Sequence, residues 1–202
     1  MAPRSAAPGP HARPAPHAPS RREVQRLFFA LWPGAAVRSA IAAATRRLEA
    51  AHRIGGRPLA PARYHLTLQF LGDFDPRAQS VIDAAIIAAD EVRMRRFELR
   101  IDRSGSFGGR RVGWLGPARV PPGLQGLSTA LGQALDRHGV PREGDGAGPW
   151  IPHVTVLRGM RGALPALEIA PLEWAVDGFV LIRSQPGHAG YDVLQHWALA
   201  EE

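Results

Sequence analysis

The feature that most restricts the fold of this chain is a four-residue pattern that occurs twice. The sequence HLTL at residues 65–68 recurs as HVTV at residues 153–156, 88 residues later. Both copies alternate polar and apolar residues, which is typical of a half-buried β-strand. The interval is longer than the repeating unit of a solenoid. The repeat therefore predicts two similar lobes, each of which contributes one strand to a shared cleft.

The polar positions of the two copies have the residue types needed for phosphoryl chemistry. Residues i and i+2 of a strand point to the same side, so His65 lies beside Thr67, and His153 beside Thr155. Two imidazoles on opposite sides of a phosphorus atom can act as general acid and general base, because the histidine pKa of about 6.5 is close to neutral pH. Threonine hydroxyls can donate hydrogen bonds to the phosphate oxygens. We expect this arrangement to need no metal and no cofactor.

A metal site is the alternative use of paired histidines. It needs three or four ligands, and neither motif has a third histidine or a carboxylate at ligand spacing. Asp73, eight residues after His65, is predicted to lie in a turn. The chain has no cysteine and no lysine, which excludes thiolate zinc sites and Schiff-base chemistry.

Hydropathy patterns on either side of the motifs predict an α+β fold with mostly antiparallel strands. Within the first motif strand, alternation places Leu66, Leu68 and Phe70 on the apolar face and Gln69 on the face of His65. Strands are predicted at 26–32, 64–71, 97–101, 111–115, 152–157, 173–182 and 192–199, and helices at 37–51, 76–93 and 124–135.

Composition divides the chain into an arm and one domain. Residues 1–22 are rich in proline, alanine and arginine and cannot bury enough surface to fold, so we expect a disordered arm followed by a single domain over 23–202. Four of the 25 arginines and none of the 18 acids lie in the arm, which leaves the domain a net charge of +3. Such a mildly basic domain suits a phosphate-bearing ligand better than duplex DNA.

The apolar residues are distributed as in a globular protein. They make up 45% of the chain, and no run approaches the roughly 20 residues of a membrane-spanning helix. We expect no membrane partner, a cytoplasmic location and a monomer. The absence of cysteine fits a reducing compartment.

The motifs and their flanks resemble the 2H phosphoesterases, in particular the RNA 2′,3′-cyclic phosphodiesterases, also called LigT-like 2′-5′ RNA ligases. The similarity extends from about residue 26 to residue 199. The matching segments are RLFFALW at 26–32, HLTLQFLGD at 65–73, RVGWLG at 111–116, PHVTVLR at 152–158, FVLIRS at 179–184 and YDVLQHWAL at 191–199.

This resemblance implies a bilobal fold in which two similar antiparallel sheets with outer helices surround a central cleft. It implies hydrolysis of RNA 2′,3′-cyclic phosphate ends to 2′-phosphates. His65 would be the proton donor to the O3′ leaving group, and His153 the proton acceptor that activates water. Thr67 and Thr155 would hold the phosphate.

The resemblance also suggests substrate-binding residues outside the four motif positions. Arg158 matches an arginine common after the second motif and could bind phosphate with two hydrogen bonds. Gln69 stands where the first motif often has an arginine, which would remove a positive charge from the cleft. Tyr64 and Trp150, just before the motif strands, and Tyr191 are candidates to stack on a nucleobase.

Three other functions remain open from the sequence. The chain could join RNA ends through a 2′-5′ linkage, hydrolyse small nucleotide cyclic phosphates, or bind RNA without catalysis. The intact histidines and threonines of both motifs favour an enzyme, because a binding module needs neither a proton donor nor a proton acceptor.

Overall fold

The computed structural model describes residues 24–107, 111–143, 150–188 and 190–201. The predicted arm lies outside this range. The strands are β1 Gln25–Leu31, β2 Arg57–Pro58, β3 Leu66–Phe74, β4 Phe97–Phe107, β5 Val112–Gly116, β6 Val154–Arg158, β7 Glu168–Val176, β8 Gly178–Ser184 and β9 Asp192–Ala198. The helices are α1 Ala35–His52, α2 Gln79–Asp90 and α3 Pro122–Arg137, with a 3₁₀ turn, η1, at Pro61–Arg63.

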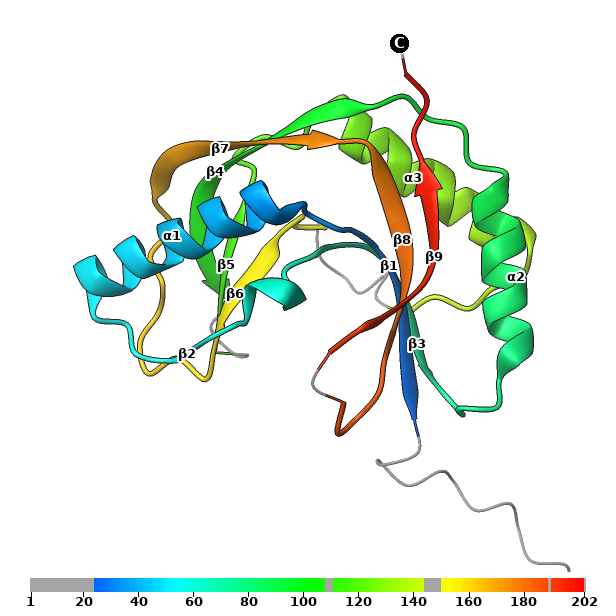
Figure 1. Cartoon of the computed structure of the whole chain (residues 1–202), viewed down its shortest axis with the longest axis horizontal. Coiled ribbons are helices and arrows are strands. Elements are labelled where there is room, and N and C mark those ends of the chain that lie inside the picture. The colour runs from blue at the N-terminus through cyan, green and yellow to red at the C-terminus, as the bar shows by residue number, and fades with distance from the viewer. Residues whose placement is uncertain (1–23, 108–110, 144–149, 189, 202) are drawn as a thin grey trace, which may run out of the picture.

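The strands within the described residues form one antiparallel sheet (Figure 1). Its order is β7-β4-β5-β6-β3-β1-β8-β9, and β2 pairs with β6. The two motif strands, β3 and β6, are neighbours at the middle of this order and pair at Leu66 and Val154. The α+β class is therefore confirmed, and the two predicted sheets are the two halves of one sheet joined between β3 and β6.

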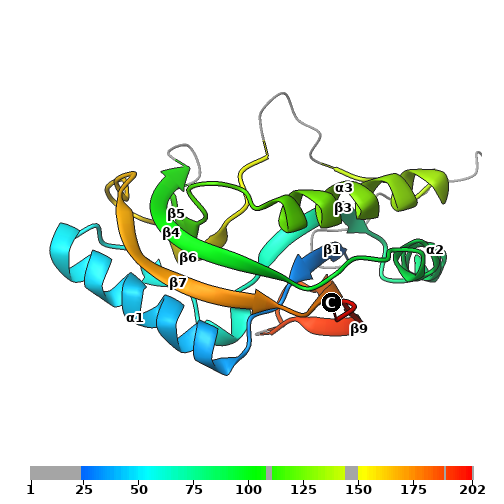
Figure 2. The same ribbon diagram turned by 90° about the horizontal axis from the view of Figure 1, so that it is seen from above.

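The helices cover the two halves of the sheet separately. Helix α1 contacts β6 and β7, whereas α3 contacts β3 and β4, and α2 packs against α3 and β9. Figure 2 shows α1 at one end of the molecule and α2 and α3 at the other. Each helix buries an apolar stripe, as the residue spacing predicts; in α3 the stripe includes Leu124, Leu127, Leu131 and Leu135.

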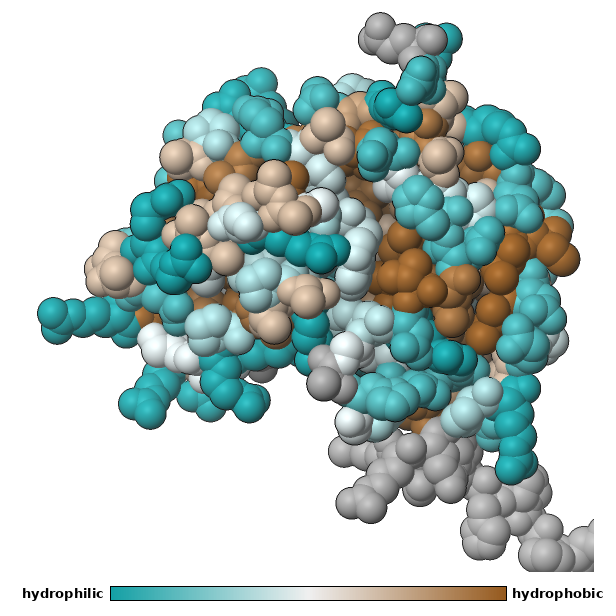
Figure 3. All heavy atoms as spheres, in the orientation of Figure 1, coloured by the Kyte–Doolittle hydropathy of each residue, from teal (hydrophilic) through white to brown (hydrophobic). Residues whose placement is uncertain are grey.

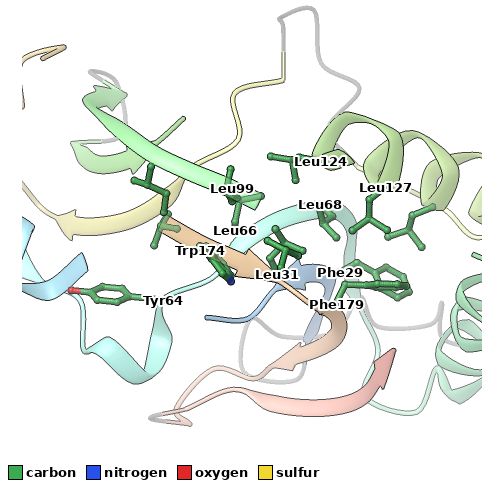
Figure 4. Close-up of a cluster of buried hydrophobic side chains, with 14 of the residues drawn as sticks. Phe29, Leu31, Tyr64, Leu66, Leu68, Leu99, Leu124, Leu127, Trp174 and Phe179 are labelled. Atoms are coloured by element: carbon green, nitrogen blue, oxygen red, sulfur yellow. The ribbon is translucent and has the colours of Figure 1, made fainter. Parts of the chain in front are cut away.

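One large core lies between the helices and the sheet. Leu66 and Leu68 of β3 point toward Leu124 and Leu127 of α3, and Phe29 lies against other aromatic side chains of the same cluster (Figure 4). A second, smaller apolar cluster is separate from this core. It consists of Phe28, Ala30, Val180 and Ile182, with Trp32, Phe70 and Tyr191 packed against it. The central strand β1 thus contributes apolar side chains to both clusters.

Several predicted elements differ from the structure in their bounds. The predicted strand 173–182 is the end of β7 and the start of β8, because the strand is interrupted at Asp177, where the chain leaves its pairing with β4 and goes on to pair with β1. The apolar residues on both sides of Asp177 hide this interruption from a hydropathy pattern. Helix α2 is shorter than its predicted range, and the two-residue strand β2 was not predicted.

The face of the molecule seen in Figure 3 is mixed, with an apolar area over β9 and α2. Ile87 of α2 and Val193 of β9 are 55% and 45% exposed. These elements are distinct from the strands that carry the paired motifs. Among the described residues, no helix is both long enough and apolar enough to cross a membrane.

Candidate active site

The pairing between β3 and β6 brings the polar residues of both motifs to one face. Leu66 pairs with Val154, and both side chains are fully buried in the core. In an antiparallel pair, the residues on either side of such a pair point to the opposite face of the sheet. His65 and Thr67 therefore lie on the same face as His153 and Thr155. His65 is opposite Thr155, and His153 is opposite Thr67. The structure brings together the four residues that the sequence predicts as a catalytic group.

Each histidine is held by the same hydrogen bond. The Nδ1 of His65 donates to the carbonyl oxygen of Arg63 over 2.8 Å, and the Nδ1 of His153 donates to that of Ile151 over 2.7 Å. Because a carbonyl oxygen only accepts, Nδ1 carries the hydrogen in both rings. The nitrogen that can exchange a proton with a substrate is therefore Nε2 in both halves.

Aromatic side chains surround His65. Its ring lies 5.0 Å from Phe28, and 6.4 Å from Trp32 in a nearly parallel arrangement. The Tyr191 ring meets it edge-on at 5.2 Å. These three side chains belong to the small apolar cluster, so the first histidine of the site is partly buried in an apolar setting.

His153 has a different aromatic neighbourhood. Phe107 of β4 meets its ring edge-on at 4.9 Å, and Trp114 of β5 lies at 6.3 Å. Trp114 is 8% exposed and lies in the interior. The two histidines thus share a backbone anchor and differ in the groups around the ring.

The surroundings of His65 favour its neutral form. Burial, which has the largest effect, acts together with His153 and the charges of Arg158 and Arg63 to lower the pKa of His65 from 6.5 to about 4, against the hydrogen bond to the Arg63 carbonyl. The contributions of His153 and Arg158 mean that the second motif acts on the first at close range. At neutral pH the His65 imidazole is uncharged.

Both motif strands contain a β-bulge at the same place. In the pairing of β3 with β1, Gln69 and Thr67 pair with consecutive residues of β1, so Leu68 between them has no pairing partner on that strand. Opposite β5, Leu157 and Thr155 have partners and Val156 has none, again 88 residues later. A bulge reverses the faces of the residues that follow it. The repeat is therefore present in the backbone as well as in the residue types.

The bulge overturns the face predicted for Gln69. Its Nε2 donates to the carbonyl of Ser128 over 2.8 Å and to the Ser128 hydroxyl over 3.3 Å, both in α3. Its Oε1 accepts from Arg142 over 3.0 Å. The prediction of Gln69 as a substrate-binding residue is wrong, since its side chain faces α3 instead of the threonine face.

The same bulge gives Arg158 a different counterpart. Arg158 follows His153 by five residues, and the residue five positions after His65 is Phe70. Phe70 pairs with Phe28 and packs in the small apolar cluster, not on the face of Leu66 as predicted. Arg158 itself is exposed, and its charge reaches His65, which agrees with a role in phosphate binding.

The two aromatic residues before the motif strands lie in different environments. Tyr64 is 2% exposed and belongs to the main core, where burial raises the pKa of its hydroxyl (Figure 4). The prediction that Tyr64 stacks on a base is therefore wrong: η1 ends just before it and directs its ring inward. Trp150 is 37% exposed, and its stacking role stays a prediction.

The sequence reasoning missed two arginines near the site. Arg63 stacks on Tyr191 with its guanidinium 4.7 Å from the ring centre, and Arg26 lies over Phe70 at 5.4 Å. Arg63 precedes His65 by two residues, and this short separation in the sequence could have identified it as a residue near the site. Arg26 lies in β1, and only the pairing of β1 with β3 brings it to this region.

The described residues include no group of three or more histidine, cysteine, aspartate or glutamate side chains that could hold a metal ion.

Comparison with known proteins identifies the family. The family model of the 2′-5′ RNA ligase superfamily matches residues 36–188. An RNA 2′,3′-cyclic phosphodiesterase of Escherichia coli (strain K12) is 34% identical over 187 residues, which cover 89% of this chain and 99% of the relative. One of Thermus thermophilus is 32% identical, over 88% of this chain and 91% of the relative.

The fold is also similar to a solved structure. The crystal structure of Escherichia coli LigT without ligand matches with a TM-score of 0.70 at 33% identity, over 88% of this chain and 99% of that one. The chain belongs to the 2′-5′ RNA ligase superfamily.

The lowered pKa of His65 predicts a pH-dependent stability. The unfolded chain binds a proton on this residue below about pH 6.5 and the folded protein only below about pH 4, so stability falls as the pH falls between these values. Between pH 7 and pH 5 the free energy of unfolding should fall by about 2 kcal/mol more in the wild type than in His65→Gln. Urea unfolding of both proteins measures this, and an equal fall in both would contradict it.

The contacts of Gln69 predict a structural role. Gln69→Ala removes the hydrogen bonds that Gln69 makes with Ser128 and Arg142, so the free energy of unfolding should fall by about 1–3 kcal/mol. Gln79→Ala is the matched control, because Gln79 is exposed on α2 and bonds only to the exposed Asp83. Its stability should stay within about 0.5 kcal/mol of the wild type. Unfolding of Gln69→Ala at the wild-type midpoint would refute the assignment.

Proposed function

We propose that this chain is an RNA 2′,3′-cyclic phosphodiesterase that opens the cyclic phosphate to a 2′-phosphomonoester by two-histidine catalysis without a metal. The observation that carries the proposal is the pair of histidines, each anchored through Nδ1 and each across the sheet from a threonine. The names of the two relatives support the cyclic phosphodiesterase activity. Cytoplasmic location and the monomeric state stay predictions.

The proposed reaction is an in-line displacement at phosphorus. The Nε2 of His153 accepts a proton from a water molecule, whose oxygen forms a bond to phosphorus. The bond between phosphorus and O3′ breaks, and the Nε2 of His65 donates a proton to the departing O3′. One water is consumed, and the phosphate stays on O2′. A proton must pass from His153 to His65 through solvent before the next cycle.

The threonines and Arg158 fit the remaining requirements of this reaction. In the described part of the structure, the hydroxyls of Thr67 and Thr155 make no hydrogen bond within the protein, so both can donate to the non-bridging oxygens of a phosphate. Arg158 adds a positive charge close enough to lower the pKa of His65. Donors placed before the reaction stabilise the charge that develops on these oxygens.

The donor role requires His65 to gain a proton when substrate binds. In the free protein its pKa of about 4 keeps it neutral at pH 7, mainly through burial and partly through the positive charges of Arg158 and Arg63. A phosphate bound between the two motifs would offset those charges and raise the pKa of His65. The anionic substrate would thus charge its own proton donor.

Ligation is a second candidate, favoured by the name of the matching family model. The same two Nε2 atoms could run the same displacement with an RNA hydroxyl in place of water as the attacking group, so that O3′ leaves and a 2′-5′ linkage forms. Incubation of a cyclic-phosphate end with a second RNA that carries a free 5′-hydroxyl distinguishes the reactions, because ligation lengthens the strand.

Removal of either histidine should abolish turnover. His65→Ala and His153→Ala should each reduce kcat for an oligoribonucleotide 2′,3′-cyclic phosphate by about 10²–10⁴-fold, because each removes one proton-transfer group. His52→Ala is the control, since His52 lies exposed in the last turn of α1. Chromatography of the products should show only the 2′-phosphate isomer, with unchanged rates in EDTA. Persistent hydrolysis in His65→Ala, or loss in EDTA that zinc restores, would overturn the proposed mechanism.

A bound anion should raise the pKa of His65. Sulfate is a suitable probe because it keeps its charge across the titration range. Nuclear magnetic resonance of the histidine ring, assigned by its loss in His65→Gln, should show titration near pH 4 without sulfate and at a higher pH with it. If sulfate binds and the pKa of His65 does not rise, the donor and acceptor roles are to be exchanged.

A further inference from the structure

A cavity of about 340 Å³ opens next to His65, between the outer ends of β1, β3 and β8 and the loop that follows β8. Its charged, amide and imidazole side chains are those of Arg26, Arg63, Asp73, Gln185 and His188. None of the residues of the two H-x-T motifs is among those that line it. The cavity is therefore separate from the candidate active site, and the two histidines proposed to transfer protons lie outside it.

Arg63 connects this cavity to the candidate active site. Its side chain lines the cavity, while its carbonyl oxygen accepts the hydrogen bond from His65 Nδ1. Its guanidinium also stacks on Tyr191 and donates to the Tyr191 hydroxyl over 3.3 Å. Since the Tyr191 ring touches the His65 ring edge-on, the cavity and the imidazole are separated by about one side chain.

The two arginines of the cavity are held in place and offer donors to an anion. Arg26 forms two hydrogen bonds to the Asp73 carboxylate, of 2.8 and 3.0 Å, and lies over the Phe70 ring. The Nε of Arg63 is buried and, within the described residues, has no hydrogen-bond partner. The Arg63 side chain lines the cavity, so its guanidinium offers a positive charge to an anion bound there.

The proposed chemistry fixes the side from which the RNA strand approaches. In an in-line displacement, water attacks opposite the leaving oxygen, so O3′ lies toward the proton donor His65 and water toward His153. O3′ belongs to the terminal ribose, and the rest of the strand continues from the 5′ oxygen of that ribose. The strand therefore extends on the side of His65, where the arginine-lined cavity lies.

We propose that this cavity binds the phosphate on the 5′ oxygen of the terminal nucleotide, the one that links it to the preceding nucleotide in RNA, through Arg63 and Arg26. This inference rests on the proposed function and adds a substrate preference. The enzyme selects polynucleotide ends over nucleoside 2′,3′-cyclic phosphates, because only the former carry this second phosphate.

The test compares adenosine 2′,3′-cyclic phosphate with the same compound carrying a 5′-phosphate. The wild type should hydrolyse the 5′-phosphorylated compound with a kcat/KM about tenfold higher, mainly through KM, as expected for a charge-assisted contact. This advantage should shrink at high salt, because the attraction is electrostatic.

Variants assign the advantage to the cavity. Arg26→Gln and Arg63→Gln should each bring the ratio of the two kcat/KM values close to one. Asp73→Asn keeps both arginines and removes the opposing carboxylate, so the ratio should rise. Arg47→Gln is the control on the exposed face of α1, an element that contributes nothing to the cavity, and the ratio should stay at the wild-type value. Thermal unfolding confirms that each variant is folded.

The outcomes separate the two proposals. Equal kcat/KM values for the two compounds in the wild type would overturn the phosphate subsite and leave the proposed function intact. A wild-type advantage that survives both arginine substitutions would also overturn the subsite. Absence of hydrolysis of either compound would overturn the proposed function, and the subsite would fall with it. If Arg26→Gln does not fold, a ratio in Asp73→Asn at or below the wild-type value counts against the subsite.

Discussion

The site depends on the pairing of Leu66 with Val154 at the middle of the sheet. This contact joins a half made of β7, β4, β5 and β6 to a half made of β3, β1, β8 and β9. Because both paired side chains are buried in the common core, the residues beside them are turned to the opposite face. Burial of two apolar residues thus sets the position of two histidines and two threonines. A shift of one residue in this register would bury the polar group and expose the apolar pair.

The two halves of the repeat are more alike in their backbone geometry than in their side chains. Both motif strands have an unpaired residue in the same place, Leu68 and Val156, and both histidines bond to the carbonyl two residues earlier. After the bulge the two halves diverge. The first presents Phe70, with a guanidinium from β1 above it, and the second presents Arg158. A shared backbone therefore supports two chemically different sides of one site.

The sequence predicted the class of fold, most elements and the convergence of the two motifs, since alternation and helical spacing follow directly from burial on one face. It failed where a local backbone change alters a face without altering the hydropathy pattern. Gln69 keeps the alternation of its strand, yet the bulge at Leu68 turns it toward Ser128. Tyr64 precedes the strand as a cleft residue would, but the turn η1 sends it into the core. Such changes depend on the partner strand and on tertiary packing, which a single sequence does not display.

The electrostatic environment of His65 depends largely on groups outside the two H-x-T patterns. Equal spacing in the sequence treats the two histidines alike, and their backbone anchors are alike as well. Burial among aromatic rings and the positive charges of Arg158 and Arg63 act on His65, so the free protein holds it neutral. The charges of Arg158 and Arg63 are positive, and a bound phosphate would balance them. In such a site His65 stays unprotonated until an anion binds. Proton donation by His65 therefore depends on substrate binding and not on the pH of the solution alone.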